Sequence, residues 1–148
     1  VLYQPEIPSN TGNIARTCVL TNSKLHLIKP LGFSIDDKQV KRAGLDYWGD
    51  LDIEVHESYE DFLNKYGNER IFLASTHADK SYHEASFKEG DFIMFGRESS
   101  GVPEEVHQRH EGIRVPLIKT STRSLNLSNT VAIVAYEALR QIDFPEMK

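Results

Sequence analysis

Short apolar runs alternate with longer amphipathic stretches along the whole chain, and this alternation predicts strands and helices in turn. The predicted strands are residues 1–3, 24–28, 52–56, 70–74, 91–95 and 113–115. The predicted helices are residues 11–21, 36–43, 59–66, 103–107 and 129–142. Strands that alternate with helices are typical of an α/β fold, so we expect a mostly parallel sheet with helices on both faces. No repeat, low-complexity tract or long linker divides the sequence, and we expect a single domain over residues 1–148.

The last predicted helix has the clearest periodicity, with an apolar stripe formed by Val131, Val134, Ala135, Ala138, Leu139 and Ile142. Ser128 or Asn129 is expected to cap its first turn, because a side-chain oxygen there accepts an unpaired backbone amide. Asn10 is the expected cap of the first helix. The positions of that helix expected to face the core are Ile14, Cys18 and Val19. We interpret Cys18 as a small buried side chain rather than as a reactive thiol.

Three polar segments lie beyond the ends of predicted strands, where a parallel sheet binds its ligands. The first is residues 8–16, PSNTGNIAR. A capped helix start with a turn glycine explains Asn10 and Gly12. It does not explain Arg16, which is either a solvated surface arginine or a side chain within reach of a bound ligand.

The second and third segments follow the last two predicted strands. Residues 95–103, FGRESSGVP, form either a ligand-binding loop or a plain turn, and they lack the lysine and glycine spacing of nucleotide-binding loops. Residues 116–129, PLIKTSTRSLNLSN, are longer than the about four to six residues of a typical connection. Such a loop is either functional or a flexible surface segment, and the alternation of Leu125 and Leu127 with polar neighbours favours a loop packed on the core.

Composition narrows the class of protein. With 148 residues, of which 39% are hydrophobic and 26% charged, the chain can bury a core without disulfides or a structural metal. A single cysteine excludes a disulfide framework and a cysteine-rich zinc site and fits a reducing compartment, so we expect a cytoplasmic protein. No apolar run approaches the ~18 residues of a membrane span, so no membrane association is expected. The first methionine is Met94, and we expect a few residues, the initiator included, to precede Val1.

Metal and hydrolase chemistry are not expected. His107, His110 and Glu111 are the histidines and carboxylate closest to a metal-ligand spacing, but a charged stretch of this kind is more often a solvated surface. A serine hydrolase would need a GxSxG elbow, which the sequence does not contain.

Together the three segments resemble the SPOUT superfamily of S-adenosylmethionine-dependent RNA methyltransferases. Within it the sequence is most similar to the tRNA 2′-O-ribose methyltransferases of the wobble nucleotide, cytidine or carboxymethylaminomethyluridine. The motifs that carry the resemblance are residues 10–16, NTGNIAR, residues 95–103, FGRESSGVP, and residues 124–129, SLNLSN. The resemblance implies a C-terminal deep trefoil knot, which general folding rules would not predict. It also implies a homodimer with active sites at the subunit interface, S-adenosyl-L-methionine as cofactor and the tRNA anticodon stem-loop as partner.

The resemblance implies roles for particular residues. The cofactor-binding positions are Ala74, Thr76, Gly96, Gly101, Val115, Leu117, Ser124 and Leu125. The catalytic group comprises Arg16, Asn10, Glu98 and Asn126. A guanidinium stays protonated in proteins, so we expect Arg16 to orient the ribose and its phosphate while another group takes the hydroxyl proton. Ser100 stands where many members of the family carry a basic residue, a departure that affects one RNA contact.

Two other functions stay open at this point. One is methylation of another RNA site, a tRNA D-loop guanosine or ribosomal RNA, and the other is a cofactor- or RNA-binding protein without catalysis. Arg16 and Asn126 favour an enzyme, because binding the cofactor requires neither of them. The formal net charge of −5 argues against general affinity for nucleic acid. Basic residues nevertheless lie mostly in or near the motifs, namely Arg16, Lys38, Lys41, Arg42, Arg97, Arg114, Lys119 and Arg123, so we expect a polarised dimer with a local, salt-sensitive RNA footprint.

Overall fold

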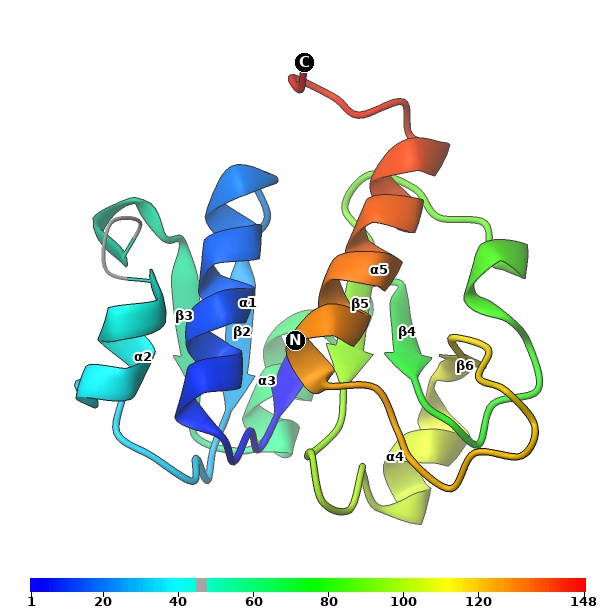
Figure 1. Ribbon diagram of the computed structural model, residues 1–148, viewed down its shortest axis with the longest axis horizontal. Helices are drawn as coiled ribbons and strands as arrows, with labels where there is room; N and C mark the ends of the chain where they lie inside the picture. Colours follow the sequence, from blue (N-terminus) through cyan, green and yellow to red (C-terminus); the bar gives the residue numbers. More distant parts are fainter. Residues whose placement is uncertain (45–47) are drawn as a thin grey trace.

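The computed structural model describes residues 1–44 and 48–148, and these form a six-stranded sheet between two layers of helices (Figure 1). The strands are β1 (Leu2–Tyr3), β2 (Leu25–Ile28), β3 (Ile53–His56), β4 (Ile71–Ala74), β5 (Phe92–Phe95) and β6 (Glu111–Ile113). Their order across the sheet is β3-β2-β1-β5-β4-β6, and all of these pairs are parallel. The predicted α/β fold class is therefore confirmed.

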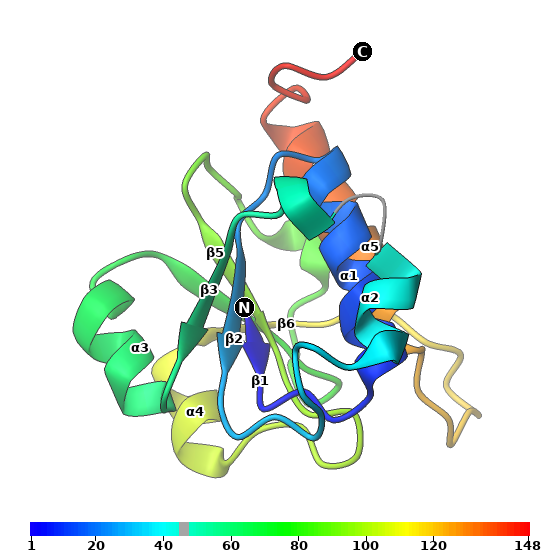
Figure 2. The same ribbon diagram turned by 90° about the vertical axis from the view of Figure 1, so that its left-hand side faces the viewer.

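Helices cover both faces of the sheet, as Figures 1 and 2 show. The helices are α1 (Pro8–Leu20), α2 (Lys38–Gly44), α3 (Tyr59–Tyr66), α4 (Glu104–Arg109) and α5 (Leu127–Gln141), with short 3₁₀ turns η1 (Trp48–Asp50) and η2 (Tyr82–Glu84). α1 and α5 pack side by side on one face and α2 packs against α1, whereas α3 and α4 cover the opposite face. Among the described residues, no helix is both long and apolar enough to cross a membrane.

The two faces of the sheet are buried by alternate residues of each strand. In β2, Leu25 and Leu27 pack in the cluster of α1 and α5, while Ile28 packs in the cluster of α3 and α4. Ile14 of α1 and Val134 of α5 are almost completely buried on the first face. Each such side chain contributes roughly 1.5–3 kcal/mol through burial of apolar surface. β4 (IFLA) and β5 (FIMF) are apolar runs without polar alternation, as expected for strands buried on both faces, whereas β2 and β3 also carry His26, Glu54 and His56.

The predicted elements agree with the observed ones except at a few ends. The sixth strand is Glu111–Ile113 rather than residues 113–115, because backbone pairing with β4 places Gly112 opposite Leu73. The apolar signal at Val115 had shifted the prediction by two residues. Cys18 is buried as predicted, and burial raises the pKa of its thiol to about 11. Val19, expected to face the core, is only half-buried.

Both predicted helix caps are wrong. α1 begins at Pro8, where a fixed φ and a missing amide suit the first helical position, so Asn10 lies inside the first turn and is buried. α5 begins at Leu127, and its cap is Asn126, whose Oδ1 accepts the Ser128 amide at 2.9 Å. The prediction had placed that cap two to three residues too late, at Ser128 or Asn129, because all three side chains suit a cap.

Candidate functional site

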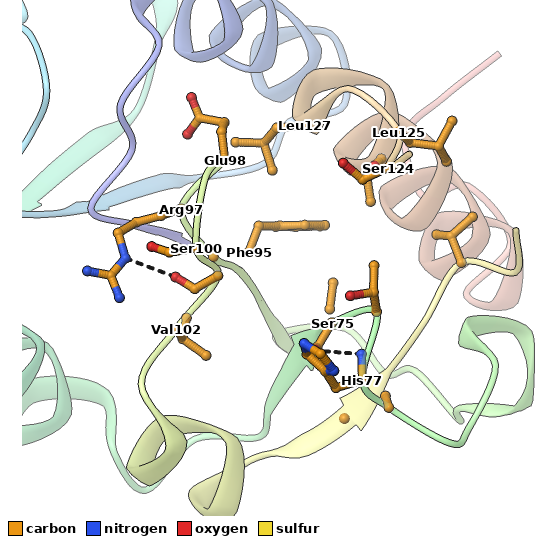
Figure 3. A pocket seen from close by; sticks show the side chains of 18 of the residues that line it. Ser75, His77, Phe95, Arg97, Glu98, Ser100, Val102, Ser124, Leu125 and Leu127 are labelled. Carbon is orange, nitrogen blue, oxygen red and sulfur yellow. Dashed lines mark hydrogen bonds between the residues drawn. The ribbon is translucent and has the colours of Figure 1, made fainter. Parts of the chain in front are cut away.

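A cavity of about 1290 Å³ opens beyond the carboxyl ends of β4, β5 and β6. Its walls come from residues 74–80 after β4, residues 95–102 after β5, and parts of residues 115–127 after β6. Figure 3 shows side chains of all three segments around the cavity. The ends of parallel strands are where the sequence predicted ligand binding. The volume exceeds the roughly 300–1,000 Å³ of a small-molecule pocket, so the cavity has room for a cofactor and part of a second substrate.

The loop after β5 is closed at its base. The Arg97 amide donates to the Gly101 carbonyl and the Gly101 amide donates to the Arg97 carbonyl, both at 3.0 Å. A Cβ at Gly96 would lie 2.8 Å from the Gly101 Cα, and Gly101 itself has φ +64°. We call residues 96–101 the glycine loop. Its conformation requires both glycines, one for close approach of backbone and one for a left-handed residue.

Glu98 connects the glycine loop to the start of α1. Its Oε1 accepts the Glu6 amide at 3.1 Å and its Oε2 accepts the Ile7 amide at 2.7 Å. Ile7 is the N-cap residue of α1 and offers no side-chain acceptor, so a carboxylate 91 residues away binds the amides at the entry to the helix. A negative charge there also interacts favourably with the helix dipole. Glu98 therefore fixes the loop relative to the helix that carries Asn10 and Arg16.

The segment between β6 and α5 is exposed from Pro116 to Asn126. The expectation that Leu125 packs on the core is wrong, since its side chain is 39% exposed and lines the cavity. Leu127 does pack against the core cluster beside α1 and α5. The two leucines are separated by the N-cap of α5 at Asn126, so only the second belongs to the helix. Leu117, equally 39% exposed, lines the same cavity.

The structure brings together most of the site residues named from the sequence. All eight positions assigned to the cofactor line the cavity, namely Ala74, Thr76, Gly96, Gly101, Val115, Leu117, Ser124 and Leu125. Of the group assigned to catalysis, Asn10, Glu98 and Asn126 also line it. Arg16 does not belong to the wall of this cavity. It lies exposed on α1, about two turns beyond Asn10.

Two histidines of the cavity wall were missed. His77 follows β4, and its amide donates to Ser75 Oγ at 3.1 Å, a bond that closes the turn after the strand. His107 of α4 faces it, with ring centroids 5.8 Å apart and ring planes at 84°. Both side chains lie at the strand-end edge that topology marks for ligands, which is the signal that could have identified them. His77 has no metal-like or catalytic spacing in the sequence, and His107 has one only with His110 and Glu111, a group interpreted above as a solvated surface.

A separate cluster of His26, Glu54 and His56 lies on β2 and β3, beneath α3 and away from the cavity wall. His26 Nδ1 and His56 Nε2 are 3.0 Å apart, and burial lowers the pKa of His26 to about 3. These residues could hold a metal ion by distance. Glu54, however, already binds Lys65 at 2.9 Å and Lys24 at 3.0 Å, and these bonds lower its pKa to about 2. A dication beside two ammonium groups is disfavoured, so we interpret the cluster as structural.

Two members of the trio His107, His110 and Glu111 contact side chains outside it. His110 Nε2 lies 2.6 Å from the Tyr59 hydroxyl, and burial lowers the pKa of His110. Glu111 forms an ion pair with Lys80 at 2.8 Å. Of that trio, His107 and Glu111 line the cavity wall.

Comparison with known proteins gives consistent results. Residues 1–136 match the family model described as the SpoU rRNA Methylase family. A tRNA (cytidine(34)-2′-O)-methyltransferase of Methylovorus glucosotrophus (strain SIP3-4) is 48% identical over 147 residues, which cover 97% of this chain and 95% of the relative. A solved structure concerned with "the 2-OH methylation of C/U34 on tRNA" has 47% identity and a TM-score of 0.92, over 96% of this chain and 93% of that one. An AdoMet-bound rRNA methyltransferase from Sinorhizobium meliloti shares the fold, with 21% identity and a TM-score of 0.87 over 95% of this chain and 55% of that one.

Proposed function

Because the chain belongs to the SpoU rRNA methylase family, we propose that it is a tRNA (cytidine/uridine-34-2′-O)-methyltransferase that uses S-adenosyl-L-methionine. The observation that carries the proposal is the 48% identity, over nearly the full length of both chains, to a relative named for this activity. The strand-end cavity supports it, because all three motif segments of the resemblance contribute to its wall, together with residues 74–80 after β4. Membership of the family also supports the trefoil knot, the single domain and a cytoplasmic location, which belong to the same proposal.

The cavity wall fits the proposed cofactor. Val115, Leu117 and Leu125 give an apolar surface suited to a flat adenine ring. The closed glycine loop brings backbone at Gly96 and Gly101 beside that surface, where side chains would obstruct close approach. Bound there, S-adenosylmethionine supplies an electrophilic methyl group on a positively charged sulfur.

The protein must align the ribose hydroxyl with that methyl group and assist loss of the hydroxyl proton. In our proposal Arg16 orients the ribose and its phosphate through its fixed guanidinium donors. Asn10 and Asn126 lie at the cavity wall, on the first turn of α1 and at the cap of α5. Glu98 accepts the amides of Glu6 and Ile7, the two residues directly before α1, and thus fixes the start of that helix relative to the glycine loop.

A homodimer accounts for the position of Arg16. The side chain is exposed on α1, outside the cavity wall of its own subunit. In a dimer packed on this face, it would lie beside the cavity of the partner subunit. α1 and α5 lie side by side (Figure 1) and expose the large side chains of Leu20 (55%), Ile133 (36%) and Tyr136 (45%). Burial of such apolar surface is the main driving force for association. We therefore propose that α1 and α5 form the subunit interface and that each site is completed by the other subunit.

The anticodon arm would contact basic side chains near the cavity. Lys119 and Arg123 lie on the exposed segment before α5, and Arg114 is exposed just after β6. The chain as a whole carries a net charge of −5, so attraction to RNA is limited to this local basic edge. We therefore expect only a small number of phosphate contacts. Binding of tRNA should accordingly weaken as salt concentration rises.

The test uses purified protein, S-adenosylmethionine with a labelled methyl group, and unmodified tRNA. Nuclease digestion followed by mass spectrometry locates the label. We expect a single 2′-O-methyl group at nucleotide 34, the position named for the relatives. Label at a D-loop guanosine or in ribosomal RNA would assign the enzyme to another RNA site, and cofactor binding without transfer would identify a non-catalytic protein.

A further inference from the structure

The chain that leaves β1 runs beside the glycine loop, because β1 and β5 are neighbours in the sheet with Leu2 opposite Phe95. Glu6 lies on this stretch and its carboxylate points to the loop tip. Its Oε1 accepts the Ser99 amide at 2.9 Å and the Ser99 hydroxyl at 2.8 Å, and its Oε2 lies 3.0 Å from the same hydroxyl. These bonds, led by the one from the Ser99 amide, lower the pKa of Glu6, with a further contribution from Arg97.

The contact is reciprocal. Glu98, the neighbour of Ser99, accepts the Glu6 and Ile7 amides from the opposite direction. Each segment thus offers one carboxylate to backbone amides of the other, and we call the four residues Glu6, Ile7, Glu98 and Ser99 the clasp. A carboxylate in a protein is stabilised by the donors that it accepts from, and here those donors all belong to the opposite segment. Because every carboxylate oxygen of the clasp accepts a hydrogen bond, the arrangement is stable only when both segments hold this register.

The clasp is not part of the hydrophobic core. Ile7 and Ser99 are exposed, and Glu6 is not a member of either core cluster. What it joins is the glycine loop, which forms a wall of the cavity, and the first turn of α1, which carries Asn10. Arg16 follows on the same helix, about 9 Å beyond Asn10 along its axis. A helix is rigid over that length, so a shift of its first turn displaces Arg16 as well.

We infer that Glu6 is a positioning residue of the methyl transfer. Its bonds to Ser99, together with those of Glu98, hold the glycine loop and α1, the helix that carries Arg16, in a fixed position relative to each other. This inference rests on the proposed function. It names a residue that the sequence patterns and the resemblance left without a role, and Glu6 acts through Ser99 and α1 rather than by touching the reacting atoms.

The variants are Glu6→Ala, Glu6→Gln and Ser99→Ala, with Glu69→Ala as a matched control because Glu69 is exposed and lies outside the cavity wall. Glu6→Ala should lower kcat by about tenfold to a hundredfold, as small misplacements of reacting groups do. KM for S-adenosylmethionine should stay within about threefold, because the Arg97–Gly101 bonds that close the glycine loop, and the apolar side chains of the cavity wall, do not depend on Glu6. Glu6→Gln should recover most of the rate, since its amide oxygen still accepts from Ser99, and Ser99→Ala should fall between them.

Amide hydrogen exchange provides a readout that does not depend on activity. Glu6→Ala should speed exchange at Ser99 and also at Ile7, whose own acceptor is Glu98, while exchange in α5 and in Glu69→Ala stays at the parent rate. The inference is overturned if kcat of Glu6→Ala stays within about threefold of the parent, or if only Ser99 exchanges faster. It is equally overturned if Glu6→Gln fails to restore the rate.

If Glu6→Ala does not fold, Glu6→Gln and Ser99→Ala provide the same comparison. A parent protein that methylates no tRNA would refute the proposed function instead, and the exchange experiment would still decide whether the clasp couples the two segments.

Discussion

Replacing Gly96 by alanine would test whether the closed glycine loop forms the cofactor wall. The added Cβ would lie 2.8 Å from both the Cα and the carbonyl carbon of Gly101. Carbon atoms in ordinary contact are about 3.5–4.0 Å apart, so the Gly101 backbone would have to retreat by about 0.7–1.2 Å. Both obstructing atoms are backbone, and no flexible side chain can move aside instead.

That retreat would break the base of the loop. The two bonds between the Arg97 and Gly101 backbones measure 3.0 Å and would exceed hydrogen-bond length after such a shift. At about 0.5–1.5 kcal/mol for each bond, closing the loop again would cost about 1–3 kcal/mol. If S-adenosylmethionine binds the closed loop, its affinity should fall by about fivefold to 150-fold.

Isothermal titration calorimetry with S-adenosylmethionine would measure the effect, and two other glycines would provide controls. A Cβ at Gly49 meets nothing within 4 Å among residues 1–44 and 48–148, so Gly49→Ala should bind like the parent. Gly101→Ala adds no clash but places alanine at φ +64°, at a cost of about 1–2 kcal/mol. The reasoning would be refuted if Gly96→Ala bound the cofactor as tightly as Gly49→Ala while remaining folded.

Three further predictions concern α1 and the buried titratable groups. Arg16→Ala should bind S-adenosylmethionine within about threefold of the parent and lose methyl transfer by at least about a hundredfold, as measured by calorimetry and label incorporation; a variant that keeps most of its rate would remove Arg16 from the mechanism. The Cys18 thiol, with a pKa of about 11, should react with iodoacetamide at pH 8 only after unfolding, and rapid labelling of the native protein would contradict its burial. The pKa of His26 is lowered to about 3, below its unfolded value, so the unfolded chain binds more protons and the free energy of unfolding should decrease as pH falls from about 6.5 towards 3. Urea titrations at pH 7 and pH 5 would measure that decrease, expected at up to about 1.4 kcal/mol per pH unit, and equal midpoints would argue against a neutral buried histidine.

Local pattern was sufficient for most of the fold, because burial on both faces leaves plain apolar runs in β4 and β5 and a majority of apolar residues in β2. It failed at Glu111 and Gly112, where backbone pairing with β4, and not side-chain character, defines the strand. The contact that holds the entry to α1 could not be predicted from local pattern, since the carboxylate that accepts the Ile7 amide belongs to Glu98, 91 residues away.

Strand-end topology located the candidate site, and the resemblance named most of its wall. Topology did not indicate which histidines would face the cavity, because His77 and His107 come from different loops and meet only in the folded chain. Glu6 was missed for the same reason, as its partner Ser99 is 93 residues further along. The trefoil knot and the homodimer stay predictions, since they depend on chain threading and on a second subunit.

The most direct test of the central claim uses two anticodon stem-loops that differ by a single oxygen atom. One carries ribose at nucleotide 34, and the other carries 2′-deoxyribose there and is otherwise identical. With labelled S-adenosylmethionine, we predict incorporation into the first and none into the second. Equal labelling of both would contradict 2′-O-methylation of the wobble nucleotide by this protein.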